Sequence, residues 1–140
     1  MKDDVKLAHE IAKRAHHGQV DKAGAPYILH PETVASFVTK DDEKIVAYLH
    51  DVIEDTPYQL SDLEEVGFSS EIIKAVDLLT RKDGQSYKQY LKLVKTNELA
   101  RVVKLADLKH NSDLSRLAQV TRNDIKRLKK YQDAIIFLST

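Results

Sequence analysis

The chain has 140 residues, 42% hydrophobic and 31% charged, which is long enough to bury a core as one domain over residues 1–140. Lys+Arg and Asp+Glu both number 22, so no net charge favours a nucleic-acid or membrane partner, and the absence of cysteine excludes disulfides and thiolate metal sites. The charged N-terminus does not fit a signal peptide, and no apolar run approaches membrane-spanning length. We therefore expect a cytoplasmic protein, whose oligomeric state the sequence does not indicate.

Helical patterns dominate, since strand-like alternation is scarce and there are only four glycines and three prolines. Gly18 suits the end of a first helix, Pro31 suits the start of a second, and Thr56-Pro57 ends a third. The prediction is a single all-α domain. Its helices are expected over 5–17, 31–40, 42–55, 61–67 (capped by Ser61 with Glu64), from Ser69 or Ser70 through Leu79, 86–95, 98–111, and from the cap at Thr121 to 138.

Chemistry-bearing residues gather on the third predicted helix. On a helical wheel its apolar residues form one arc that faces the core, and the opposite arc carries His50, Asp51, Glu54 and Asp55, with Ala47 among them. A histidine beside an aspartate offers a nitrogen and an oxygen ligand, and the two acids one turn later could handle the protons of a water on the metal. The alternative is a solvated acidic face, which the lack of a lysine at i+4 disfavours because the acids repel one another.

Further ligands are needed, and Asp107 and His30 are the candidates. Asp107 lies at the edge of a mostly apolar helix, where a carboxylate must be coordinated or paired, for instance with a lysine. His30 is expected to end a loop and could equally be a surface residue, as we expect of His9, His16, His17 and His110. Two imidazoles and two carboxylates suit manganese or a similar divalent ion better than a closed structural zinc site.

Four ordered segments resemble a known family, the hydrolase domain of RelA/SpoT proteins within the HD-domain phosphohydrolases. The segments are Ala15-His16-His17-Gly18-Gln19, Gly24 to Pro31 around His30, Leu49 to Thr56 around His50-Asp51, and Lys104 to Asp107 with Asn111. The chain looks like a stand-alone hydrolase, similar to the small SpoT homologues.

The resemblance implies an all-α, HD-type helical bundle with the metal site in a central cleft. It implies a manganese-dependent hydrolase that removes the 3′-pyrophosphate from guanosine tetra- or pentaphosphate, a small-molecule nucleotide substrate. It also implies roles for particular residues. They are metal ligation by His30, His50, Asp51 and Asp107, orientation and deprotonation of the attacking water by Glu54 and Asp55, and substrate contacts by Lys22, Asn111 and Tyr27.

Two positions depart from the family pattern. Asp21 stands where the family usually has an arginine that stacks on the guanine, and Leu108 stands where a basic residue usually follows the metal-binding aspartate. Lys82, Lys88 or Arg101 could replace the missing arginine. An HD-type hydrolase of another nucleotide or nucleotide-derived phosphate is therefore the second hypothesis, and a non-catalytic nucleotide-binding module is the third.

Overall fold

The computed structural model describes residues 2–140. Within this range the chain is helical and has no strand, apart from one isolated bridge between Val20 and Pro26, which confirms the all-α prediction. The helices are α1 (Lys2–Ala15), α2 (Leu29–Ser36), α3 (Asp41–Leu49), α4 (Val52–Asp55), α5 (Leu60–Val66), α6 (Ser70–Leu79), α7 (Tyr87–Lys95), α8 (Glu98–Asn111), the short 3-10 helix η1 (Leu114–Arg116) and α9 (Arg122–Ser139).

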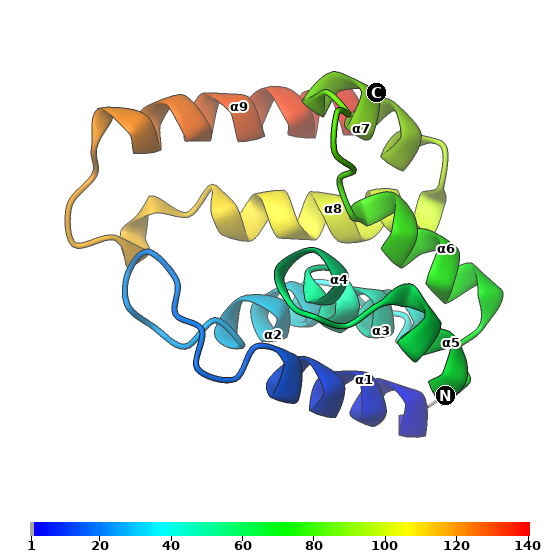
Figure 1. Ribbon diagram of the computed structural model, residues 1–140. Helices are drawn as coiled ribbons and strands as arrows, with labels where there is room; N and C mark the ends of the chain where they lie inside the picture. Colours follow the sequence, from blue (N-terminus) through cyan, green and yellow to red (C-terminus); the bar gives the residue numbers. More distant parts are fainter. Residues whose placement is uncertain (1) are drawn as a thin grey trace.

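The helices stack in layers around α3 and α8 (Figure 1). Helix α3 contacts α1, α2, α6 and α8, and α8 in turn contacts α2, α7 and α9. Because α3 is covered on nearly every side, residues on all of its faces are buried, including Ala47, and so is His50 directly after its last residue. The wheel prediction that these two lie on a polar arc facing away from the core is wrong for this reason.

The core is made of aliphatic side chains from the central helices. Burial of each such side chain stabilises the fold by about 1.5–3 kcal/mol. The largest that are almost fully buried are Ile45, Leu49, Leu63, Ile72, Leu108 and Leu138. Leu108, one of the two departures from the family pattern, is therefore part of the core.

Several helix ends lie where the sequence predicts them. Ser69 accepts a hydrogen bond from the backbone N–H of Ile72, and Thr121 forms a capping box with Asp124. Gly18 has a φ of +82°, in the left-handed region that glycine adopts without strain. The cap of α5 differs, because Gln59 and Asp62 form the capping box in place of Ser61 and Glu64.

Two boundaries change the setting of the candidate site. Helix α2 begins at Leu29, so His30 lies in its first turn and not in a loop, and Pro31 fits there because first-turn N–H groups have no helical acceptor. The single helix predicted over 42–55 is interrupted at His50 and Asp51, between α3 and α4. The His50 ring donates a hydrogen bond to the Ala47 carbonyl. In an unbroken helix that carbonyl would accept a hydrogen bond from the backbone N–H of Asp51.

Candidate metal centre

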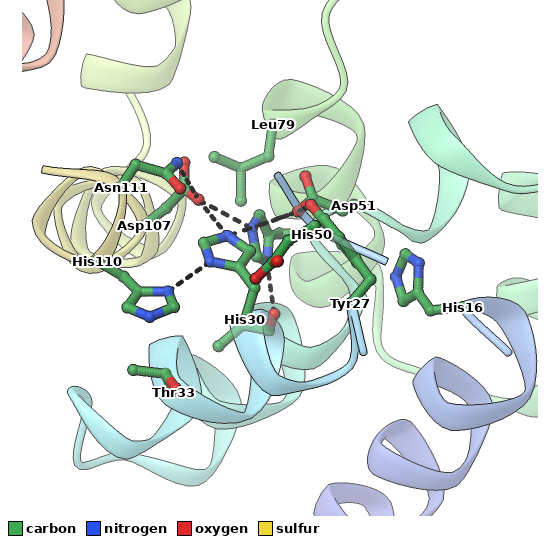
Figure 2. Close-up of polar contacts among 12 residues, drawn as sticks. His16, Tyr27, His30, Thr33, His50, Asp51, Leu79, Asp107, His110 and Asn111 are labelled. Carbon is green, nitrogen blue, oxygen red and sulfur yellow. Dashed lines mark hydrogen bonds and ion pairs between the residues drawn. The ribbon is translucent and has the colours of Figure 1, made fainter. Parts of the chain in front are cut away.

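Four side chains converge at the centre of the molecule. His30 comes from α2, His50 and Asp51 from the break between α3 and α4, and Asp107 from α8 (Figure 2). His30 Nε2 lies 2.7 Å from Asp107 Oδ1, and His50 Nε2 lies 3.0 Å from Asp51 Oδ2 and 3.3 Å from Asp107 Oδ1. One ligand atom from each residue lies within 4.8 Å of all the others, so the cluster could hold a metal ion.

Both histidine rings are oriented by hydrogen bonds on the far side from the cluster. His50 Nδ1 donates to the carbonyl of Ala47 at 2.6 Å, which directs Nε2 at the two carboxylates. His30 Nδ1 is 2.7 Å from Nδ1 of His110, and these two rings stack with centroids 4.9 Å apart. The expectation that His110 is a surface residue is wrong, since it is 8% exposed and positions His30. Its i+3 spacing from Asp107 on the same helix is the signal that could have found it.

Asp107 accepts hydrogen bonds from two side chains outside the four-residue cluster. Its Oδ2 accepts a hydrogen bond from Lys104 Nζ at 2.8 Å, and its Oδ1 accepts one from Asn111 Nδ2 at 3.2 Å. Burial by itself would raise the pKa of Asp107, but the Lys104 ammonium and the bonds from His30 and His50 hold it well below its usual range. Both sequence interpretations of Asp107 therefore apply, because it pairs with a lysine and faces the histidines.

Asp51 is held by Tyr27, whose hydroxyl donates to Asp51 Oδ2 at 2.6 Å. Burial would raise the pKa of Asp51, but the charge and hydrogen bond of His50 lower it to about 2. His50 responds in the opposite sense: burial would lower its pKa, and the Asp51 and Asp107 carboxylates raise it well above its usual range. A proton on His50 thus neutralises part of the cluster's negative charge, a role that a divalent cation fills at a site of two imidazole nitrogens and two carboxylate oxygens.

The predicted acid pair, Glu54 and Asp55, shares a cavity with three of the four ligands, His30, Asp51 and Asp107. Glu54 Oε1 accepts a hydrogen bond from the backbone N–H of Arg81 at 2.9 Å. Desolvation, together with the charges of Asp51 and Glu54, raises the pKa of Asp55 to about 6. The cavity has a volume of about 270 Å³ and is also lined by Tyr27, Arg81, Tyr87, Lys104, Asn111, Lys130 and Tyr131.

The segment around His16 attaches the α1–α2 connection to this acid pair. His16 is buried, contrary to expectation, and its Nδ1 donates to Gln19 Oε1 at 2.9 Å. The Gln19 amide then donates to the backbone carbonyl of Asp55 at 3.1 Å. Part of the motif from Ala15 to Gln19 therefore holds the end of α4.

A second cavity, of about 300 Å³, adjoins the first, and both are lined by Tyr27, His30, Asn111 and Tyr131. Lys22 lines the second cavity only, together with Arg116 and Arg127. Asp21 is engaged locally, since its Oδ1 accepts hydrogen bonds from the backbone N–H groups of Ala23 and Ala25. Its other carboxylate oxygen lies 3.6 Å from Arg116 Nη1, so a guanidinium from η1 stands beside the position where the family has its arginine.

The lysines and the arginine considered as replacements do not line either cavity. Lys82 pairs with Asp77 at 2.9 Å, Lys88 lies in a groove between α7 and α9, and Arg101 donates to the carbonyl of Leu138. Lys109, next to Leu108, sits over the ring of Phe37. The cationic residues that do line the acid cavity are Arg81, Lys104 and Lys130.

His110 predicts a pH dependence of stability in the metal-free protein. Burial, with the Arg116 and His30 charges, lowers its pKa from 6.5 to about 4. The unfolded state then binds a proton more readily than the folded state does. The contribution of neutral, buried His110 to the free energy of unfolding is therefore complete above pH 6.5 and is lost as the pH falls towards 4. Between about pH 7.5 and pH 5, urea unfolding in chelator should show that the wild type loses about 2 kcal/mol more stability than His110→Asn does. Equal losses for both proteins would contradict the assignment.

An all-α domain with an adjacent His-Asp pair, a further histidine and a further aspartate around one point is an HD-type fold. No protein-family model matches the chain. Within residues 2–140, no helix is both long and apolar enough to traverse a lipid bilayer.

Curated relatives point to a particular family within this class. The chain is 40% identical over 115 residues to a guanosine-3′,5′-bis(diphosphate) 3′-pyrophosphohydrolase of Haemophilus influenzae, covering 72% of this chain and 17% of the relative. It is 30% identical over 122 residues to the bifunctional (p)ppGpp synthase/hydrolase SpoT of Escherichia coli, covering 76% and 17%. These matches confirm the resemblance to RelA/SpoT proteins, although the chain spans only about one sixth of their length.

A solved structure described as a metazoan ortholog of SpoT that hydrolyzes ppGpp shares the fold. It matches with a TM-score of 0.76 and 22% identity, over 96% of this chain and 84% of that one. The helical architecture is thus that of a known hydrolase structure across nearly the whole chain.

Proposed function

We propose that this chain is a metal-dependent hydrolase that removes the 3′-pyrophosphate from guanosine tetra- and pentaphosphate. One observation carries the proposal: the ligand atoms of four residues lie within 4.8 Å of one another, and three of these residues, His30, Asp51 and Asp107, line the same cavity as two further acids. The relatives named for this reaction support the choice of substrate. Arg81, Lys104 and Lys130 at the cavity supply the positive charge that a polyphosphate requires.

We assign metal ligation to His30, His50, Asp51 and Asp107, and we propose manganese because the donor set mixes nitrogen and oxygen. A bound divalent ion would lower the pKa of a water and screen the negative charge of the phosphate. The fit rests on the orientation of both Nε2 atoms towards the two carboxylates. With His30 Nε2 as a ligand, its Nδ1 carries the proton and donates to His110, which fixes the ring.

We assign removal of the proton from the attacking water to the acid pair. Asp55, with a pKa of about 6, is ionised at neutral pH and is a stronger base than an ordinary aspartate. Glu54 is held by the Arg81 backbone and orients the water. Asn111 and Lys22 would contact the substrate from the two adjoining cavities, while Tyr27 acts through its hydrogen bond to Asp51.

The test is direct. The protein loaded with Mn²⁺ is incubated with guanosine tetraphosphate, and released pyrophosphate is measured against Asp51→Asn as the control. Turnover well above the control, lost on chelation and restored best by Mn²⁺ among Mg²⁺, Mn²⁺ and Zn²⁺, is the expected result. Stoichiometric metal binding without turnover on any phosphate ester would instead favour the non-catalytic module.

A second substrate class remains a candidate because Asp21 replaces the family's arginine. The guanidinium of Arg116, which lines the second cavity beside Asp21, would contact the nucleoside end of the substrate. A matched panel of guanosine and adenosine nucleotides, with and without a 3′-diphosphate, decides between the two. Faster turnover of an adenosine or a 3′-unphosphorylated nucleotide would establish the alternative.

Arg116 gives a specific prediction about substrate binding. Because it lines the second cavity and not the acid cavity, Arg116→Gln should raise KM about tenfold and leave kcat within about twofold. Arg122→Gln, on an exposed residue at the start of α9, is the matched control and should change neither constant. A loss confined to kcat would place Arg116 with the chemistry and not with binding.

A further inference from the structure

A groove outside the four-residue metal cluster runs between α7 and α9, which contact each other near the C-terminal end of α9 (Figure 1). Its volume of about 610 Å³ exceeds that of either cavity at the candidate site. Along α9 it extends from Lys126 to Phe137, which is about 16 Å at a helical rise of about 1.5 Å per residue. The groove is therefore as long as three turns of a helix.

The floor of the groove is apolar. Leu91 of α7 and Ala134 of α9 are buried at its base, and the rings of Tyr87 and Phe137 also line it. The Lys130 ammonium lies 4.0 Å from the centre of the Tyr87 ring. An apolar row on one face of a ligand would bury carbon surface here, which favours association.

The rim of the groove is basic. Lys88, Lys126, Lys129 and Lys130 line it with a single acid, Asp133, and none of the four lysines forms an ion pair with any residue in 2–140. The chain as a whole carries no net charge, so this is a local concentration of positive charge. Unpaired like charges repel one another, and an anionic ligand would relieve that repulsion.

We propose that this groove binds an acidic amphipathic helix of a partner protein. Such a helix lays its apolar face on a groove floor through residues spaced at i, i+3, i+4 and i+7, and its carboxylates meet the lysines at the rim. The length of the groove favours a helix over a small anion. Tyr87 and Lys130 line both the groove and the acid cavity, so a bound helix would touch the wall of the candidate active site. The proposal does not depend on the proposed hydrolase function.

The test measures binding of a synthetic probe to the full chain by fluorescence anisotropy. The probe is a fluorescein-labelled helix of about five turns, with leucine on one face and glutamate elsewhere. Lys126→Glu/Lys129→Glu should weaken binding by about tenfold or more. Lys6→Glu/Lys13→Glu, on exposed lysines of α1, should stay within about twofold. All four positions are exposed, and circular dichroism checks that each variant is folded.

Two further probes separate the apolar and charged contributions. A peptide with serine in place of leucine should fail to bind, and one with lysine in place of glutamate should fail as well. Binding of the serine peptide, equal losses in the two double variants, or no binding to the wild type would overturn the proposal. Complete displacement by inorganic phosphate would assign the groove to small anions, and self-association abolished by Lys126→Glu/Lys129→Glu would assign it to a second copy. Either result also overturns it.

Discussion

Replacing Asp107 with asparagine should lower the free energy of unfolding by about 3–5 kcal/mol, because Lys104 would be left without its anionic partner in a buried position. The same change should weaken Mn²⁺ binding by about 100-fold or more, since it removes one of four proposed ligands. Unfolding in urea measures the first effect, and titration calorimetry of the folded variant measures the second.

The two roles of Asp107 can be separated in a double variant. Lys104→Met with Asp107→Asn removes both buried charges, so most of the lost stability should return while metal binding does not. Asp77→Asn is the control, because Asp77 pairs with Lys82 at 2.9 Å but both side chains are about half exposed. It should cost no more than about 1 kcal/mol. If the double variant also regained Mn²⁺ affinity, Asp107 would not be a ligand.

Removing either acid should slow hydrolysis with little change in metal binding. For Glu54→Gln and Asp55→Asn we expect kcat to fall by about 10²–10⁴-fold, the usual contribution of a positioned acid or base. The Kd for Mn²⁺ should remain within about threefold, because neither side chain belongs to the four-residue cluster. Glu65→Gln, on an exposed acid of α5, should alter neither quantity.

The pH profile distinguishes the two acids. With a pKa of about 6, Asp55 is a base above that pH, so kcat should fall about tenfold for each unit below it. Since the Glu54 charge is one cause of the raised pKa of Asp55, Glu54→Gln should move this acidic limb to lower pH. If the acidic limb of the kcat profile disappeared in Glu54→Gln and persisted in Asp55→Asn, Glu54 would be the base and Asp55 would orient the water.

Local patterns identified most of the helices, because capping and proline rules act within a few residues. Ser69 and Thr121 start their helices as expected, and α8 has the predicted bounds. The break at His50 was not predictable in this way. It depends on a side chain that takes a backbone carbonyl while packed beneath other helices, and a helical wheel contains no information on either.

The chain by itself determined which residues could bind a metal, since cysteine is absent and a His-Asp pair, a histidine and an aspartate recur in a recognisable order. Only the tertiary structure decided what supports them. His110 behind His30, and Arg81 and Lys130 at the cavity, come from segments up to about eighty residues away from the groups that they contact or face. Proximity of this kind is a product of helix packing, which local sequence patterns do not encode.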